Sequence, residues 1–589
     1  MDMTKADSGI HEFGDFRVDA GKRVLLRDSE TVPLTPKVFD TLLHLVQNHG
    51  KTVEKEELMR TIWPDTIVEE NNLSQNISTL RRVLGQNQAD LRYIVTVPGK
   101  GYRFVADVRS QGQIVSATPT SQSSTRTTLA VLPFENLSAN AEKDYLADGL
   151  TEETITALGQ IDADHLNVIG RTSVMAYKRT IKTLHEIGKE LGAAYLVESS
   201  LRSEGERIRI TSKLIRASDQ VQIWTASYDS EPSSMLVFER ELSAAIAEQI
   251  RLRLSPERML LLARRHTKNA EAYDLYLRGR HYWYQLTPPT TKRAIDYFTQ
   301  ATQLDREYAL AWSGIADANS ASPINGDAPS IPAWNRSKEA AAHAVAAEPN
   351  LAEAQTSWAL VNFWFAWDWL AAESAHRKAI ELDPNYHLAH RMLGIVLGHM
   401  GRHSEAQASV RRAREIDPLL AVHQALSAYL AFIAGDYSAA LQFARQAIVV
   451  DPDFWIGHFQ LGQVQLQLGH TELALESLNS AARLSGGNSK TFALRGYFFG
   501  KLGRVDKAME ILNTLEVISR ERYVPPYALA LIYAGLGQGD SAFEWLEKAY
   551  EVRDVHLIFL PVDPKWDSLR ADGRFASLVK RCGFHTIGG

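Results

Sequence analysis

A predicted helix over Glu69–Leu84 combines one apolar stripe with a polar face of unusual composition. Its apolar side chains recur at helical spacing, so this stripe must face a core: Leu73, Ile77, Leu80 and Leu84. At about 100° per residue, the opposite face and its flanks carry amides, hydroxyls and one guanidinium. These residues are Asn71, Ser74, Gln75, Ser78, Thr79 and Arg82. Such groups hydrogen-bond to base edges in the major groove, whereas a solvated helix carries mixed Glu and Lys, so the helix is predicted to read DNA.

Cations accompany this helix on a predicted hairpin over Tyr93–Val105. Lys100 lies at the glycine-flanked tip and Arg103 follows it, where both could contact phosphate. Arg81, near the end of the helix, is a third candidate for a phosphate or minor-groove contact. The hairpin is therefore predicted to hold the nucleic-acid backbone while the helix reads bases.

The charge of this region does not make it basic as a whole. Residues 11–107 contain 13 Lys and Arg against 14 Asp and Glu. Electrostatic attraction to DNA must then come from cations gathered on one side. The acidic residues expected to be turned elsewhere are Glu54, Glu56 and Glu57. The plain alternative is a small packing domain whose polar helix is simply exposed.

Local signals predict the elements that position the helix. Thr35 followed by Pro36 predicts a hydroxyl N-cap and a proline at the first helical position. This helix should stop before Gly50, and a short second helix over residues 58–63 should end before Pro64. Alternating side chains over Phe13–Arg17 and over Val24–Leu26 predict half-buried strands.

Residues 11–107 resemble the winged helix-turn-helix domain of the OmpR/PhoB type, which is shared with the CadC and ToxR group of regulators. The matching segments are Leu34–Leu43, Leu58–Trp63, the polar helix and Val97–Phe104. The resemblance implies an N-terminal antiparallel sheet, a third helix in the major groove and a wing that reaches towards the minor groove. It also implies more Arg on that helix than this chain has, since Ser78 and Thr79 stand at matching positions.

The composition of the whole chain favours a multidomain globular protein. It has 589 residues, a formal charge of −6 and a single cysteine, which excludes an internal disulfide framework. No signal peptide or transmembrane span is expected, so the location is predicted to be cytoplasmic, with no membrane partner. The predicted organisation is residues 1–108 as the winged helix, 109–127 as a flexible linker, 128–266 as a second domain and 267–589 as a repeat array.

The second domain reads as a small α/β unit with strands near residues 129–132, 166–169 and 194–197 and a closing antiparallel pair over 208–215 and 221–227. It resembles the TolB-like domain found beside tetratricopeptide repeats, through residues 130–137, 145–153, 198–202 and 207–211 and Trp224. Asp148, Glu152 and Glu153 could suggest a catalytic or metal site. We instead expect Asp148 and Thr151 to cap a helix, because no further ligand keeps a recognisable spacing.

The last half of the chain repeats every 34 residues. The same register recurs at Gly401, Gly435, Gly469, Gly503 and Gly537, and five residues later at Ala406, Ala440, Ala474, Ala508 and Ala542. This spacing is that of the tetratricopeptide repeat, an all-α superhelix. Seven or eight repeats are expected over residues 272–554, with an insertion at Ser320–Pro332 and a final helix around Phe575–Lys580. Such an array offers a concave groove for a protein or peptide partner. The aromatic residues over 362–369 are more often core than groove.

These observations predict a transcriptional regulator that binds double-stranded DNA through its winged helix and receives a signal or a partner through the other domains. We expect no enzymatic activity, cofactor or metal, since neither a phosphate-binding loop nor metal-ligand spacing occurs. Two alternatives stay open. One is a protein-interaction scaffold whose winged helix does not bind DNA, and the other is a small-molecule-sensing adaptor.

Overall fold

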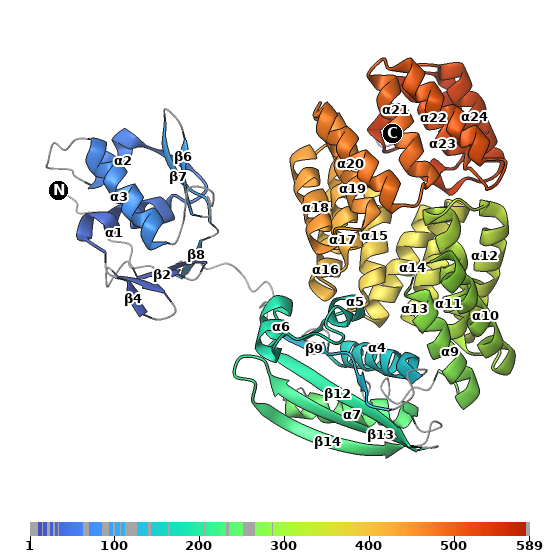
Figure 1. The fold of residues 1–589 in the computed structure, drawn as a ribbon, viewed down its shortest axis with the longest axis horizontal. Helices are drawn as coiled ribbons and strands as arrows, with labels where there is room; N and C mark the ends of the chain where they lie inside the picture. Colours follow the sequence, from blue (N-terminus) through green and yellow to red (C-terminus); the bar gives the residue numbers. More distant parts are fainter. Residues whose placement is uncertain are drawn as a thin grey trace. The chain divides into compact units, whose positions relative to one another are not determined.

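The structure is a computed structural model that forms two compact units, residues 1–123 and 124–589 (Figure 1). It describes residues 10–14, 16–19, 24–27, 30–32, 34–62, 70–84, 93–97, 100–106, 108–111, 126–138, 143–162, 165–204, 207–230, 235–250, 266–285 and 287–584.

The described residues of the first unit form two antiparallel sheets and three helices. One sheet has the order β4-β3-β2-β1-β8, built from β1 Ile10–Phe13, β2 Phe16–Asp19, β3 Val24–Arg27, β4 Glu30–Val32 and β8 Arg109–Gln111. The other has the order β5-β7-β6, built from β5 Thr52–Glu54, β6 Ile94–Val97 and β7 Gly101–Phe104. The helices are α1 Pro36–Gln47, α2 Lys55–Ile62 and α3 Glu70–Val83. This is the winged helix-turn-helix arrangement expected from the sequence.

Two details of the first unit differ from the prediction. Thr35 is the N-cap of α1, but its hydroxyl makes no capping hydrogen bond, so only the position of the cap was predicted correctly. The segment Phe13–Arg17 is not one strand, because the chain turns at Gly14, where φ is +51°, and pairs β1 with β2. Short alternation does not reveal a tight turn that lies inside it. Trp63 and Pro64 lie outside the described residues.

The second unit begins with a mixed sheet of order β11-β9-β12-β13-β14, with the short β10 paired to β12. Its strands are β9 Thr127–Val131, β10 Glu135–Asn136, β11 Leu166–Val168, β12 Tyr195–Glu204, β13 Arg207–Arg216 and β14 Gln222–Ser230. The predicted closing pair is confirmed as antiparallel β13 and β14. Strand β8 occupies the first residues of the predicted linker 109–127, and β9 begins at its last residue. The domain boundaries stay predictions.

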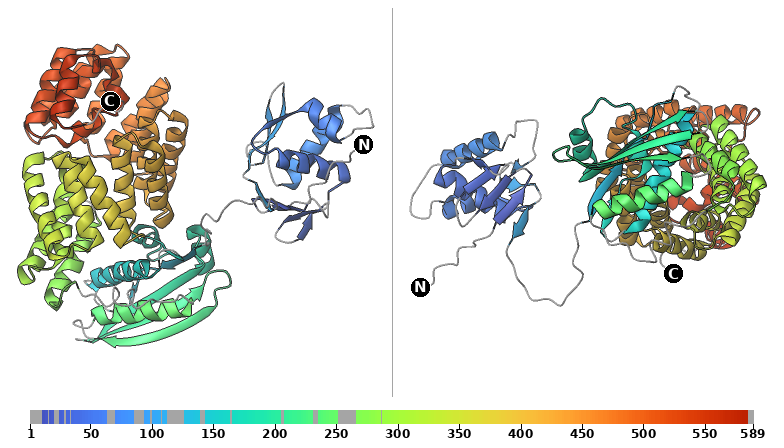
Figure 2. Two further views of the ribbon diagram at one scale, coloured as in Figure 1. Left: turned by 180° about the vertical axis from the view of Figure 1, so that it is seen from behind. Right: turned by 90° about the horizontal axis from the view of Figure 1, so that it is seen from below.

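Four helices cover this mixed sheet: α4 Asp144–Ile161, α5 Arg171–Met175, α6 Leu184–Leu191 and α7 Met235–Gln249. Along β9 the side chains alternate between two cores. Leu129 and Val131 pack with α4 and α7, whereas Ala130 packs with α5 and α6. The sheet therefore has helices on both faces, and Figure 2 shows it from two further sides.

The cap predicted at Asp148 and Thr151 is wrong. Helix α4 begins at Asp144, so both residues lie inside it and are buried. The hydroxyl of Thr151 donates to the carbonyl of Ala147 at 2.8 Å and accepts from the backbone N–H of Phe134 at 3.0 Å. The helix starts one turn earlier than the polar residues suggested, because its first turn already contributes Leu146 to the core.

The rest of the second unit is a large helical repeat region that resembles tetratricopeptide repeat proteins. Its eight helix pairs, within the described residues, are α9 Ala270–Trp283 with α10 Pro288–Leu304, α11 Ala309–Asn325 with α12 Ser330–Ala347, α13 Ala352–Val361 with α14 Trp369–Leu382, α15 His387–His399 with α16 His403–Ile416, α17 Ala421–Ile433 with α18 Tyr437–Val450, α19 Trp455–Gln467 with α20 Thr471–Leu484, α21 Ser489–Lys501 with α22 Val505–Ile518, and α23 Pro526–Gly535 with α24 Gly539–Glu551.

The periodic residues have the roles that the sequence predicted. The five glycines between paired helices have φ between +70° and +79°, a region that favours glycine. The five alanines that follow them have no exposed surface, which lets paired helices approach closely. The predicted insertion at Ser320–Pro332 is largely wrong, since α11 continues to Asn325 and α12 begins at Ser330.

Residues near the end of the repeat array contact residues of its early repeats. After α24 the chain forms η4 Val555–Phe559, η5 Pro564–Leu569 and α25 Gly573–Arg581. The side chain of Asp327, just after α11, accepts a hydrogen bond from the hydroxyl of Ser489 at 2.5 Å, at the start of α21. Arg553 donates to the carbonyl of Phe365 at 2.7 Å. Early and late repeats are thus joined directly.

The aromatic residues over 362–369 belong to the core, as expected. They form η3 Asn362–Ala366 and the start of α14, and Phe363 and Phe365 have no exposed surface. The ring of Phe559 in η4 lies 6.3 Å from that of Trp364 and 5.7 Å from that of Tyr429, centroid to centroid. The C-terminal segment therefore packs on the first helices of several pairs. No helix in the described part of the chain is long and apolar enough to cross a membrane.

Candidate nucleic-acid interface

Helix α3 buries its apolar face and exposes its polar face, as its sequence predicts. The stripe of Leu73, Ile77, Leu80 and Leu84 is at most 4% exposed and packs in the core of the first unit. The candidate base-reading residues that are exposed on the other side are Ser74, Gln75, Ser78 and Arg82. Thr79 is half-buried beside them. Asn71 lies in α3, but its side chain is outside the described part of the structure. The structure thus brings four candidates onto one open helical surface.

A residue that sequence reasoning missed fixes α3 against α1. The side-chain amide of Asn76 donates to the carbonyl of Lys37 at 3.2 Å and to the hydroxyl of Thr41 at 2.9 Å. Lys37 in turn donates to the carbonyl of Ile62 at 2.5 Å, at the end of α2. These bonds hold the three helices together beneath the exposed face. The only sequence signal was an amide beside the apolar stripe, which does not distinguish a structural from a solvated residue.

Arg81 lies at the edge of α3 and contacts the hairpin. Its guanidinium donates to the carbonyl of Ile94 at 3.1 Å and to the hydroxyl of Thr96 at 2.8 Å. Both acceptors belong to β6, so Arg81 fixes the hairpin relative to α3. The sequence suggested that this residue contacts phosphate. Its position in the structure suggests that it also positions the hairpin. These bonds use Nε and one terminal nitrogen of the guanidinium, so the other terminal nitrogen keeps two N–H donors and the phosphate contact stays a prediction.

The two cations of the hairpin differ in their surroundings. Lys100 is exposed at the turn, and no hydrogen bond or ion pair involves its ammonium within the described residues. Arg103 is exposed on β7 and donates to the hydroxyl of Thr52 at 2.6 Å. Lys100 is therefore free to reach a phosphate, whereas Arg103 is held along the sheet.

The short sheet depends on a glycine and carries an acidic residue near its cations. A Cβ at Gly101 would lie 2.0 Å from the carbonyl oxygen of Val53, so only glycine fits where β7 crosses β5. Thr52 pairs with Arg103 and Glu54 pairs with Gly101, which places Thr52, Glu54 and Arg103 on one face. Glu54 therefore shares a face with Arg103, so the expectation that it turns away does not hold for this cation.

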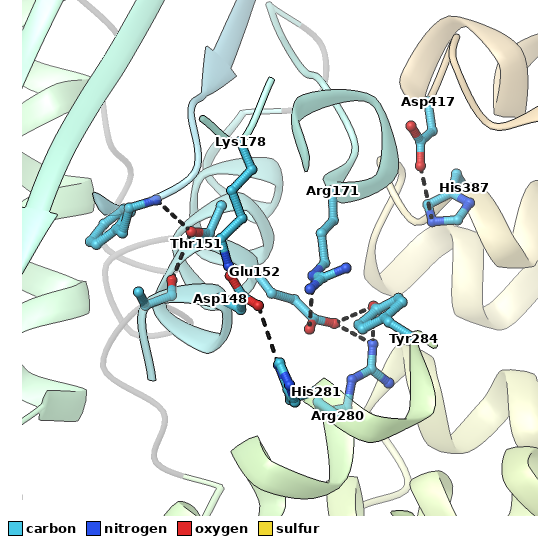
Figure 3. A network of polar contacts seen from close by, with 12 residues as sticks. Asp148, Thr151, Glu152, Arg171, Lys178, Arg280, His281, Tyr284, His387 and Asp417 are labelled. Atoms are coloured by element: carbon cyan, nitrogen blue, oxygen red, sulfur yellow. Dashed lines mark hydrogen bonds and ion pairs between the residues drawn. The ribbon is translucent and has the colours of Figure 1, made fainter. Parts of the chain in front are cut away.

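A second polar cluster lies between α4 and the first repeats (Figure 3). It includes Asp148 and Glu152, two of the acidic residues that the sequence analysis considered for a catalytic or metal site. Glu152 accepts hydrogen bonds from Arg280 and, at 2.6 Å, from the hydroxyl of Tyr284. Asp148 accepts from Lys178 at 2.6 Å and pairs with His281 at 3.2 Å. Burial acts to raise the pKa of both carboxyls, but these partners hold each pKa below its usual value. Helical periodicity could not show that residues more than a hundred positions apart would pair.

The same junction continues at α5. Asp417, which follows α16, accepts hydrogen bonds from the backbone N–H of Ser173 at 2.8 Å and from its hydroxyl at 2.5 Å. A Cβ at Gly170 would lie 2.7 Å from the side chain of Asp417, so the two segments are in close contact. The amide of Asn385 also donates to the carbonyl of Gly159 at 2.8 Å. The mixed-sheet domain is thus fastened to the repeats by buried hydrogen bonds.

Two family models match the chain. Residues 29–104 match the model described as transcriptional regulatory protein, C terminal. Residues 124–246 match the model described as HilA/YgeH-like transcriptional regulator, second domain. The first match covers α1 to α3 and the hairpin, and the second covers the mixed sheet.

Three relatives match different lengths of the chain. Putative adenylate cyclase 3 of Rhizobium meliloti is 30% identical over 202 residues, 34% of this chain and 34% of its own length. Transcriptional regulator HilA of Salmonella typhi is 23% identical over 450 residues, 74% of this chain and 71% of its own length. The KDP operon transcriptional regulatory protein KdpE of Escherichia coli is 35% identical over 103 residues, 17% of this chain and 46% of its own length.

The relatives named as regulators agree with the geometry of the first unit. The family match covers the exposed α3, its anchors on α1 and the hairpin that Arg81 attaches to it. HilA is similar to the chain over most of the length of both proteins. From this combination of site geometry and relatives, the chain is a DNA-binding transcriptional regulator.

Proposed function

We propose that this regulator reads promoter DNA with the exposed face of α3 in the major groove. The observation that carries the proposal is the solvent exposure of Ser74, Gln75, Ser78 and Arg82 opposite a fully buried stripe. Hydroxyls and amides there can pair with base edges, and Arg82 can bond a guanine through two donors. Asn71 and Thr79 flank this face and are proposed as further base contacts.

The hairpin is proposed to act as a wing that holds the DNA backbone. Lys100 is suited to a phosphate, because its ammonium is exposed and unpaired among the described residues. Arg103 is proposed to contact phosphate or the minor groove after leaving Thr52. Arg81 is proposed to position the wing rather than to reach DNA first, since its donors already bond β6.

Selection of genomic DNA fragments by the full-length protein tests this function. The expected result is enrichment of a defined sequence, which Arg82→Ala reduces or relaxes at one base position. Arg17→Ala, an exposed arginine on β2, is the matched control and should enrich the same fragments. If no sequence is enriched by the unmodified protein, the interaction scaffold becomes the better interpretation.

We propose that the other domains receive a signal or bind a protein or peptide partner. The mixed-sheet domain is proposed to be TolB-like, from the sequence segments that resemble that domain, and to have no catalytic activity of its own. A partner in the repeat groove would have to share the groove with the C-terminal segment that contains η4, η5 and α25. In that segment Lys565 donates to the side chain of Gln463 on α19 at 3.0 Å. As a regulator that binds the chromosome, the protein is proposed to act in the cytoplasm.

A small-molecule signal is the second candidate, favoured by the buried charges between α4, α5 and the repeats. Glu152, Arg171 and Arg280 are side chains that could respond to a polar ligand, because buried charges are sensitive to their partners. Thermal-shift screening of the full chain against metabolites tests this candidate. A reproducible, saturable rise in the melting temperature would support it, and no rise with any metabolite would count against it.

A further inference from the structure

Arg391 on α15 is half-buried, and its guanidinium has no partner among the described residues. Within the described residues it makes no hydrogen bond or ion pair, and its Nε is shielded from solvent. Burial lowers its pKa to about 10, although Tyr386, Asp417 and Asp317 act in the opposite direction. A charge that is partly withdrawn from water and has no counter-ion gains from a bound anion, so this position is suited to one.

Two histidines lie beside Arg391. His387 precedes it by four residues, about one helical turn, and therefore lies on the same side of α15. The ring of His423 on α17 packs edge-on against that of His387, with centroids 5.2 Å apart. Nδ1 of His387 and both ring nitrogens of His423 are buried without a hydrogen-bond partner. Burial lowers the pKa of both histidines, that of His387 to about 4, and the charge of Arg391 lowers them further.

Asp417 adds an acceptor to this group. Its Oδ1 holds Ser173, but its Oδ2 is buried without a hydrogen bond and lies 3.9 Å from Nε2 of His387 (Figure 3). The cluster therefore combines donors that suit an anionic group with one acceptor that suits a hydroxyl. Native proteins pair nearly all buried polar atoms, so a concentration of unpaired ones points to a missing polar molecule.

We propose that Arg391, His387 and His423 bind the single anionic group, carboxylate or phosphate, of a small hydroxylated metabolite whose hydroxyl donates to Oδ2 of Asp417. Asp317 on α11 carries a charge that acts on Arg391, which disfavours a ligand with several negative charges. Because Asp417 also holds Ser173 of α5, the ligand would lie directly beside the contact between the mixed-sheet domain and the repeats. The proposal specifies the site and ligand class of the small-molecule candidate above.

Calorimetric titration of the full-length protein with inorganic phosphate and with lactate, at constant ionic strength, tests the site. We expect saturable binding of at least one probe and a rise in melting temperature that an equal concentration of chloride does not produce. Arg391→Met should weaken binding at least tenfold. Arg411→Met, at an exposed arginine of α16, is the matched control and should bind like the unmodified protein.

Folding of the variants is checked in the same experiment. Without probe, Arg391→Met should melt at the same or a higher temperature, because it removes a half-buried charge that has no partner among the described residues. His423→Phe keeps an aromatic ring against His387 but removes both ring nitrogens, and it should weaken binding severalfold.

Binding of phosphate alone, of lactate alone or of both identifies the anionic group. Binding of neither, or undiminished binding by both variants, overturns the proposal. Selection of DNA fragments is a separate readout, so this failure is distinguishable from failure of DNA recognition.

Discussion

Arg81 on α3 donates a hydrogen bond to the hydroxyl of Thr96 on β6, 2.8 Å away. A second bond reaches the carbonyl of Ile94. The helix proposed to read bases and the hairpin proposed to hold phosphate are therefore attached to each other through one side chain. Their spacing is set within the protein before DNA is met, which reduces the ordering cost of binding.

Replacing Arg81 by alanine should loosen the hairpin. The two lost hydrogen bonds contribute about 1 kcal/mol each, so amide hydrogen exchange in β6 and β7 should become roughly thirtyfold faster. Affinity should fall for all DNA sequences alike, because no base contact is lost. Arg82→Ala is the matched control, since no hydrogen bond involves Arg82 within the described residues, and should leave exchange unchanged. Equal exchange in both variants would contradict the positioning role.

Arg82 and Lys100 should affect DNA binding in different ways. Arg82→Ala should cost about 1–3 kcal/mol on the preferred sequence and little on random DNA, because a base contact is lost. Lys100→Ala should weaken binding to every sequence and reduce the slope of log affinity against log salt by about one, because one phosphate contact is lost. Fluorescence anisotropy with both kinds of duplex across ionic strengths measures the two effects. Unchanged affinity in both variants would reject the assignments.

Gly101→Ala should disrupt the short sheet. The added Cβ would meet the carbonyl oxygen of Val53 at 2.0 Å, and a backbone atom cannot move aside without breaking the pairing of β5 with β7. Overpacking of this kind costs about 1–3 kcal/mol, which should appear as faster hydrogen exchange in both strands. Gly573→Ala is the control, because nothing lies within 4 Å of a Cβ there. Unchanged protection of β5 in Gly101→Ala would be inconsistent with this geometry.

Ser173→Ala should weaken the junction between the mixed-sheet domain and the repeats. It leaves one oxygen of the buried Asp417 with only the backbone N–H of residue 173, at a cost of about 1–3 kcal/mol. Ser243→Ala is the matched control, because that buried hydroxyl has no hydrogen-bond partner among the described residues and its loss should be nearly neutral. Thermal unfolding of both variants measures the difference. Equal melting temperatures would mean that the contact with Asp417 adds nothing to stability.

Asp383→Asn should change how stability depends on pH. Burial and the charge of Glu353 raise the pKa of this carboxyl from 3.8 to about 7, against a backbone hydrogen bond from Asn385. A raised folded-state pKa means that the folded protein binds more protons, so stability is lost as pH rises from about 4 to 7. Each pKa unit corresponds to about 1.4 kcal/mol. The variant should therefore gain melting temperature at pH 7.5 but little at pH 4. An equal effect at both values would contradict the assigned cause.

The sequence predicted elements better than it predicted the partners of polar residues. The 34-residue period located the turns, because each one needs glycine at positive φ. The apolar stripe of α3 correctly implied its buried face, since helical geometry fixes which residues share a side. These features are local or repeat at a fixed period.

The errors concern contacts that local patterns do not encode. Asp148 was expected to cap a helix and instead pairs with His281, more than a hundred residues away in the sequence. Arg81 was expected to contact phosphate, which stays a prediction, but the sequence did not indicate its bonds to β6. In each case a charged side chain is compatible with both roles, and only the folded chain decides which partner is near. The contacts that α3 makes with DNA stay predictions for the same reason.

The contact between Asp327 and Ser489 limits how this repeat array can evolve. An open solenoid can gain or lose a unit with only its neighbours affected. Here an added or deleted unit between the second and seventh pairs would shift the start of α21 away from the end of α11 and separate these two side chains. The number of repeats between α11 and α21 should therefore stay constant. Duplicated repeats should be tolerated only outside this part of the chain.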